Sequence, residues 1–246
     1  MEVHHHSHHG KKKWTEYLWE FLMLFLAVFC GFLAEYQLEH TIEHQREKEY
    51  VKSLVADLET DQQILSQHII HLKLGISRVD SLINILHNPA QVAGHTSDLY
   101  FLARLGPRLD PLSTNSRTFD QLKNSGSFRL IRNISTSNKI MTYYEKFPLV
   151  HLLESMNETE FNEYKKIAVK IFDPMVFLKM EKENGIIERS AENPMLHSTD
   201  RELFQELSVF AVYLRGTKTG LLNTSEALKS AGAELLDYLK KEYHLQ

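Results

Sequence analysis

The apolar stretch at residues 17–38, YLWEFLMLFLAVFCGFLAEYQL, constrains this chain more than any other feature of its sequence. Its uncharged core, residues 21–34, would form roughly 21 Å of helix, whereas the hydrocarbon layer of a bilayer is about 30 Å thick. Trp14, Tyr17 and Trp19 on one side and Tyr36 on the other are typical of interfacial aromatic residues. The sequence therefore predicts a membrane anchor over residues 14–38.

Two alternatives for this stretch are less favourable. A buried core helix would not need aromatic residues at both ends. Cleavage or lipidation at Cys30 is disfavoured because bulky Phe29 precedes it and the apolar run continues past it. We therefore expect the anchor to be retained, with Glu20 and Glu35 near the two boundaries or the bilayer locally thinned.

The charges that flank the anchor predict its orientation. Lys11, Lys12 and Lys13 abut the apolar run on its N-terminal side, whereas Glu35 and Glu39 are among the first charges after it. The positive-inside rule places the tail, residues 1–13, in the cytoplasm and the large C-terminal domain outside it.

Two groups of histidines are candidate metal ligands. The tail contains His4, His5, His6, His8 and His9, which could bind Zn²⁺, Ni²⁺ or Cu²⁺ weakly through neutral imidazoles, or simply be solvated. In the juxtamembrane stalk, residues 39–50, His40 and His44 share a helical face with Glu47. The alternative for these residues is a solvated stalk, and we expect no other cofactor.

Composition and periodicity predict an all-α fold. The 246 residues include only six prolines and ten glycines, and the net charge of −4 gives no reason to expect nucleic-acid binding. Cys30 is the only cysteine, so no intramolecular disulfide can form.

From Val51 a row of mainly apolar residues advances in steps of four and three up to Asn88-Pro89, where we expect a helix to stop. Its members are Val51, Val55, Leu58, Gln62, Leu65, Ile69, Leu72, Ile76, Val79, Ile83 and Leu86.

A second long helix is predicted near the C-terminus. Thr199 and Glu202 fit a capping box, and a second row follows with the same steps. Its members are Leu203, Leu207, Phe210, Leu214, Thr217, Leu221, Thr224, Leu228, Ala231, Leu235 and Tyr238. The apolar surface of the first helix is too wide for a two-stranded coil, so we predict one N-terminal transmembrane helix followed by an extracytoplasmic bundle of long antiparallel helices, residues 51–246.

The middle of the chain is predicted to contain shorter elements. We expect a loop over residues 89–97, a short helix over 98–105, a tight helical corner near Gly126, a helix that Ser135 or Thr136 caps and that runs to Phe147, and a loop over 181–197. This region also carries candidate anion-binding side chains, for which a solvated basic face is the alternative. They are Arg104, Arg108, Arg117, Lys123, Arg129 and Arg132.

A small-residue surface runs along the anchor. Ala27, Cys30, Gly31 and Ala34 lie near the side of the helix that carries Glu20, and the pair Ala27 and Gly31 would let another helix approach closely. A glutamate inside the membrane is a functional candidate, although Glu20 could also reach the cytoplasmic interface beside Trp19.

Three segments resemble a family of uncharacterised single-pass inner-membrane proteins of Gram-negative bacteria, which has no assigned activity. They are residues 20–35, the series Arg46, Glu47, Lys48, Glu49, Tyr50, Leu54, Asp57, Leu58 and Asp61, and the series Phe119, Leu122, Ser125 and Gly126. The resemblance implies a protein of the cell envelope and no particular reaction. In the inner membrane, the orientation predicted from the flanking charges would place the C-terminal domain in the periplasm.

The chain lacks the common catalytic motifs, which makes an enzyme the least favoured interpretation. We expect a membrane-anchored, non-enzymatic interaction or assembly module of the cell envelope, with the lipid bilayer and either a second copy of itself or an envelope protein as partners. The alternatives are a sensor-like adaptor and an oligomeric channel or stator-like component that uses Glu20.

Overall fold

The structure, a computed structural model, describes residues 13–245, apart from the side chain of Pro89. The chain divides into two units, residues 1–50 and residues 51–246. The described residues form helices without a strand, together with one isolated antiparallel bridge between Glu181 and Ile187. The all-α expectation is thereby confirmed.

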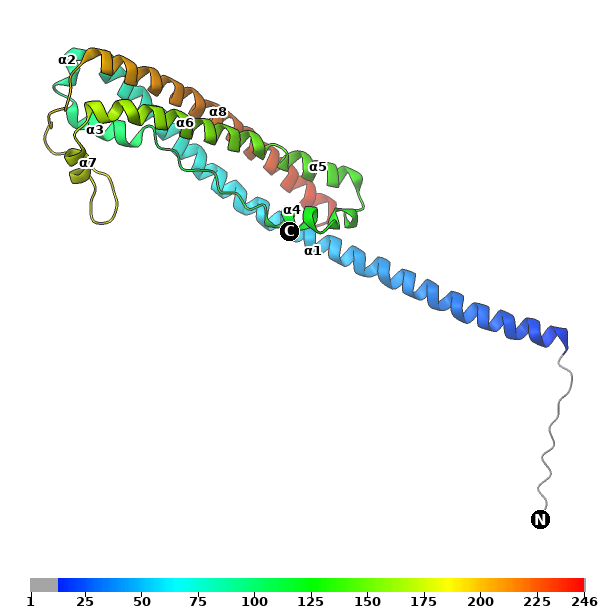
Figure 1. The fold of residues 1–246 in the computed structure, drawn as a ribbon. Helices are drawn as coiled ribbons and strands as arrows, with labels where there is room; N and C mark the ends of the chain where they lie inside the picture. The colour runs from blue at the N-terminus through cyan, green and yellow to red at the C-terminus, as the bar shows by residue number, and fades with distance from the viewer. Residues whose placement is uncertain (1–12, 246) are drawn as a thin grey trace. The chain divides into compact units, whose positions relative to one another are not determined.

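Helix α1, Trp14–His87, begins in the first unit. Its apolar segment is long and apolar enough to cross a membrane, and none of that segment is buried (Figure 1). Helix α1 continues without a break through the polar residues 39–50, and it ends immediately before Asn88, as predicted. Within residues 13–245 the structure thus contains one candidate membrane-spanning helix, near the N-terminus.

The second unit is a bundle in which residues 51–87 of α1, α6 (Phe147–Ile171) and α8 (Arg201–Glu242) lie side by side (Figure 1). Three ion pairs join α1 to α8: Asp80 with Arg215, Lys73 with Glu226 and Glu59 with Lys240. The residue number falls along α1 as it rises along α8. This order confirms the predicted antiparallel arrangement of the two long helices.

The row of buried residues that runs along each long helix differs from the predicted row at every second position. The buried rows of α1 and α8 each advance in steps of three and four, and we call these two buried rows together the seam. On α1 the seam consists of Val51, Leu54, Leu58, Asp61, Leu65, His68, Leu72, Gly75, Val79, Leu82 and Leu86. On α8 it consists of Phe204, Leu207, Ala211, Leu214, Lys218, Leu221, Ser225, Leu228, Gly232, Leu235 and Leu239.

The prediction followed hydropathy at these positions, and three of its choices, Val55, Ile69 and Thr217, are buried beside the seam. It chose Ile76 and Phe210, for example, which lie one residue away from the seam and are only partly buried. The centre of the interface instead holds small or polar residues, and side chains of neighbouring elements lie directly against its glycines. A Cβ built on Gly75 would lie 3.6 Å from Nζ of Lys218, and one built on Gly232 would lie 2.5 Å from Nε2 of Gln62.

Shorter helices complete the bundle: α2 (Pro89–Val92), α3 (Thr96–Leu105), α4 (Arg117–Asn124), the 3₁₀ helix η1 (Ser127–Leu130), α5 (Ile134–Tyr144) and α7 (Pro174–Met180). The expected corner is confirmed, because Gly126 adopts φ 67° directly after the C-cap of α4. The loop over 181–197 is also confirmed. The loop over 89–97 is not, because Pro89 starts the single turn α2, as proline does at the first position of a helix.

Two predicted helix caps are wrong by one to three residues. Asn133, rather than Ser135 or Thr136, caps α5, and its side chain accepts the N–H groups of both those residues. Asp200, rather than Thr199, caps α8 by accepting the N–H of Glu202. In addition, α5 ends at Tyr144 and a separate helix begins at Phe147, because Pro148 fits the first turn of a new helix.

The close approach at Gly232 generates a stability prediction. A methyl group there would press on Gln62 and on the ring of Tyr143, which lies 3.2 Å from the built Cβ. We expect Gly232→Ala to lower the free energy of unfolding by about 1–3 kcal/mol, measured by chemical denaturation.

Gly216 on the same helix is the matched control, because nothing lies within 4 Å of a Cβ built there. Gly216→Ala should raise the free energy of unfolding by up to about 1 kcal/mol through helix propensity alone. Equal effects of the two substitutions would contradict the close approach at Gly232.

Candidate functional site

The seam contains three buried ionisable side chains, which make it the candidate functional site of the bundle. Asp61 is 0% exposed, Lys218 is 1% exposed and His68 is 6% exposed. Charged groups are rarely buried to this extent without a partner, because removing them from water is costly. Each of the three has a different environment.

Asp61 and its neighbour Asp57 hold the segment that leads into α4. Oδ1 of Asp61 accepts the backbone N–H of Asn115 at 2.7 Å, and Oδ1 of Asp57 accepts the Asn115 side-chain amide at 2.6 Å. Oδ2 of Asp57 accepts the N–H of Thr118, in the first turn of α4, at 3.1 Å. The two carboxylates therefore fix the entry to α4 by satisfying donors that would otherwise be unpaired.

The second oxygen of Asp61 is not satisfied in the same way. Oδ2 of Asp61 has no hydrogen-bond partner, nor do the buried hydroxyls of Tyr143 and Tyr144. Burial raises the pKa of Asp61 to about 6, with a smaller contribution from the charge of Asp57 and an opposing one from the N–H of Asn115. Burial likewise raises the pKa values of both tyrosines, and the charge of Asp61 adds to that effect.

His68 lies two turns further along α1. Burial lowers its pKa, which favours the neutral imidazole, and its Nε2 has no hydrogen-bond partner. On α8 the hydroxyl of Ser225, another member of the seam, is also without a partner. These unpaired polar atoms show that the middle of the seam is polar and incompletely satisfied.

Lys218 extends from α8 past Gly75, whose missing side chain leaves room for its ammonium group. Its Nζ donates a hydrogen bond to the carbonyl oxygen of Arg108 at 2.7 Å. Among residues 13–245 no carboxylate forms an ion pair with it. Burial lowers the pKa of Lys218 to about 8, and the charge of Asp110 opposes that shift.

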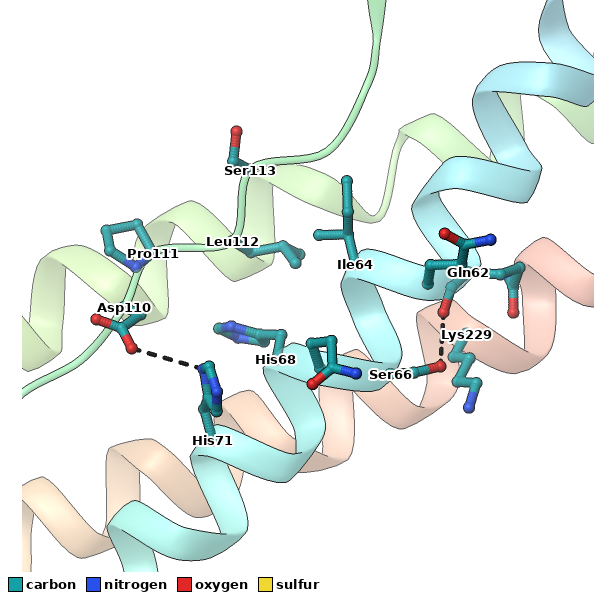
Figure 2. A pocket seen from close by; sticks show the side chains of 12 residues that line it. Gln62, Ile64, Ser66, His68, His71, Asp110, Pro111, Leu112, Ser113 and Lys229 are labelled. Atoms are coloured by element: carbon teal, nitrogen blue, oxygen red, sulfur yellow. Dashed lines mark hydrogen bonds and ion pairs between the residues drawn. The ribbon is translucent and has the colours of Figure 1, made fainter.

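Two hollows open beside these residues, where the chain between α3 and α4 crosses α1. The first, of about 330 Å³, is lined by Lys218, Gly75, His68, His71 and Asp110 among others. The second lies alongside it and shares His68, His71 and Asp110 (Figure 2). In Figure 2 both imidazoles project from α1 toward Asp110, whose carboxylate lies 3.6 Å from Nδ1 of His71.

The chemistry of this arrangement is proton binding and polar recognition. Burial shifts the pKa of Asp61 up to about 6 and that of Lys218 down to about 8, and it lowers the pKa of His68. The hollows bring Lys218 and His68 close to solvent. The part of the chain that the structure describes contains no group of three or more side chains placed to hold a metal ion.

The predicted small-residue surface of the anchor lies on the exposed part of α1. Ala27, Cys30, Gly31 and Ala34 are all exposed, as is Glu20. Nothing lies within 4 Å of a Cβ built on Gly31. The role of these residues in helix association stays a prediction.

The predicted metal ligands fall into two groups. His4, His5, His6, His8 and His9 lie outside the described residues. His40 packs edge-on against Tyr36, with ring centroids 4.3 Å apart, and Nδ1 of His44 lies 3.4 Å from a carboxylate oxygen of Glu47. Metal binding by His40 and His44 stays a prediction.

The six basic residues predicted to bind an anion are not gathered at one place. Arg104 bonds to the carbonyl of Phe177 and pairs with Glu181, and Arg117 pairs with Asp57 at 3.5 Å. Lys123 and Arg129 lie on α4 and η1, well away from α3 in Figure 1, and Arg132 follows η1. Only Arg108 borders a hollow of the candidate site.

No protein-family model, no curated protein and no solved structure matches this chain. The candidate site therefore stands on the geometry of the bundle.

Sequence reasoning missed Asp61, His68 and Lys218 as site residues. The available signal was their spacing: each occupies a step of a three-and-four row whose other members are mostly apolar. A polar residue at such a position is either a register-setting or a functional feature.

The raised pKa of Asp61 predicts how stability depends on pH. A carboxyl whose pKa is higher in the folded state stabilises that state below its unfolded pKa, and the contribution is lost as pH rises through the folded value. We expect Asp61→Asn to remove a fall in stability between about pH 4 and pH 6, and to raise the free energy of unfolding at pH 7.5 by about 1–2 kcal/mol. Chemical denaturation at several pH values measures this, and a pH profile parallel to that of the wild type would contradict it.

The lowered pKa of Lys218 predicts that the free energy of unfolding rises with pH, in a higher pH range than the fall caused by Asp61. Because its pKa is lower in the folded state, the charged form is penalised below about pH 8, and the penalty disappears as the unfolded chain also loses its proton near pH 10.5. The stability of the wild type relative to Lys218→Met should therefore rise by about 1–3 kcal/mol from pH 8 to pH 10.5. The exposed residue Lys241 provides the control, since Lys241→Met should give a curve parallel to that of the wild type.

Proposed function

We propose that this chain is a membrane-anchored, non-enzymatic interaction or assembly module of the bacterial cell envelope, with its N-terminus in the cytoplasm and its bundle in the periplasm. The observation that carries the proposal is that a single helix, α1, contains both an exposed apolar segment and one side of a buried interface. The lysines before that segment support the orientation. Such a chain holds a folded bundle at a membrane surface.

The surface of the bundle supports an interaction role. On α6, Leu149, Leu152 and Met156 are exposed at a spacing that places them on one face of the helix. On α8, the exposed residues Val209, Val212 and Tyr213 form a similar group. Large apolar side chains gathered on a surface are typical of protein contacts.

A sensor-like adaptor is the second candidate, and the seam is the observation that favours it. Asp61 and His68 lie on α1, the helix that also contains the apolar segment, and burial raises the pKa of Asp61 to about 6 while it lowers that of His68. Binding or protonation at the seam would change the packing of α1 against α8.

A channel or stator-like role for Glu20 is tested by proton flux in vesicles, which Glu20→Gln should abolish if the role holds.

The membrane anchor itself generates a prediction. An arginine near the middle of a membrane-spanning helix costs about 2.5–3.5 kcal/mol of insertion free energy. We expect Val28→Arg to release a large share of the chain from the membrane fraction after alkaline extraction, whereas Gln37→Arg, near the end of the span, should leave it bound. Equal extraction of the two variants would contradict the span.

The interaction role is tested at the exposed face of α6. A photo-crosslinking residue placed at Leu152 in intact cells should capture a defined envelope protein or a second copy of the chain. Leu152→Glu should reduce the recovery of that complex at least about tenfold without changing thermal stability, because Leu152 is exposed.

Glu158→Lys, at an exposed position of the same helix outside the apolar group, is the matched control and should leave the complex intact. Recovery that is insensitive to both substitutions would exclude this face as the contact.

A further inference from the structure

A separate groove of about 450 Å³ lies between α3, α6 and α7 and is lined mainly by apolar and aromatic side chains. They include Ala103, Tyr164, Ala168, Val169, Phe172 and Phe177. Concave, mostly apolar sites of this size that carry a few polar groups are typical of small-molecule binding. The hollows beside Lys218 have a more polar environment.

The floor of the groove is aromatic, and the hydroxyl of its tyrosine already bonds to a backbone carbonyl. Tyr164 is 1% exposed, and its hydroxyl donates to the carbonyl oxygen of Ala103 at 3.2 Å. The rings of Phe172 and Phe177 lie 5.5 Å apart, and that of Phe172 also packs edge-on against Tyr100 at 5.0 Å. A ligand on this floor would meet hydrocarbon and ring faces.

The polar lining of the groove has one sign of charge. It contains Arg104, Arg108 and Lys165, and no acidic residue. Arg104 is occupied by the carbonyl of Phe177 and by Glu181. By contrast, among the described residues no carboxylate pairs with Arg108 or Lys165, and the Lys165 ammonium lies 4.7 Å above the ring of Phe161.

We propose that this groove binds a long-chain fatty acid, with the acyl chain on the aromatic floor and the carboxylate between Lys165 and Arg108. Charge complementarity selects the occupant: an apolar channel bordered by two unpaired cations fits a molecule with one hydrocarbon chain and one anionic end. The small residues Ala103 and Ala168 leave width for a chain. Val169, which is 72% exposed, marks the side on which the groove opens to solvent.

The test uses the full chain in phosphatidylcholine nanodiscs and a palmitate probe that carries a photoreactive diazirine, with labelled residues mapped by mass spectrometry. We expect labelling at groove residues such as Val169 and Phe177, and its displacement by dodecanoate but not by dodecyltrimethylammonium. Each methylene added to the competitor should strengthen displacement by up to roughly fourfold while the chain still fits. Labelling of the apolar segment of α1 provides the internal reference.

Three variants separate the groove from its surroundings. Lys165→Glu should weaken groove labelling by about tenfold or more, and Ala168→Trp should abolish it by filling the channel. Lys166→Glu is the control, because Lys166 pairs with Glu163 and does not line the groove. Thermal unfolding establishes that Ala168→Trp is folded, and Lys165→Glu tests the proposal independently because its side chain is exposed.

Several results would overturn the proposal. Labelling confined to α1, labelling that Lys165→Glu leaves unchanged, or equal displacement by the cationic competitor would each exclude a carboxylate site. Displacement by dodecyl phosphate at a concentration more than tenfold below that of dodecanoate would assign the groove to a phosphate-bearing lipid. Exclusion of the probe by a protein crosslinked at Val169 would assign it to a protein partner.

Discussion

The antiparallel packing of α8 against residues 51–87 of α1 is the interaction on which the rest of the bundle depends. Its two buried rows place small or polar residues at the centre, where the side chain of Lys218 lies against Gly75 and those of Gln62 and Tyr143 lie against Gly232. Among the shorter helices, α5 packs against α8, whereas α7 packs against α3. The carboxylates of Asp57 and Asp61, which emerge from the same stretch of α1, fix where α4 begins.

Much of this architecture was predictable because it depends on periodicity and on turn chemistry. The apolar segment, the end of α1 just before Asn88, the left-handed Gly126 and the antiparallel long helices all follow from local patterns. Errors arose where either of two adjacent residues could be the buried member of a row that advances in steps of three and four. Hydropathy favours Phe210 over Ala211, yet the smaller residue lies in the seam, since neighbouring helices decide the outcome.

The candidate site was harder to predict than the fold. Lys218 belongs to the seam only because Gly75, more than a hundred residues earlier, leaves space for it, and the carbonyl it bonds belongs to Arg108. None of these residues is near another in sequence, so no motif unites them. The basic side chains between residues 104 and 132 suggested one charged patch, but the fold distributes them between α3, α4 and the segments that follow.

The opposite slopes of Asp61 and Lys218 have a joint consequence for the bundle. Between about pH 6 and pH 8 both groups carry their charges inside the seam, so the interval around neutrality is where burial costs the most. If a molecule bound in this pH range and neutralised either charge, the protein would take up or release a proton as the molecule binds. The affinity of the seam for such a molecule would consequently depend on pH, and calorimetry in buffers of different ionisation enthalpy would register that proton exchange as a difference in heat.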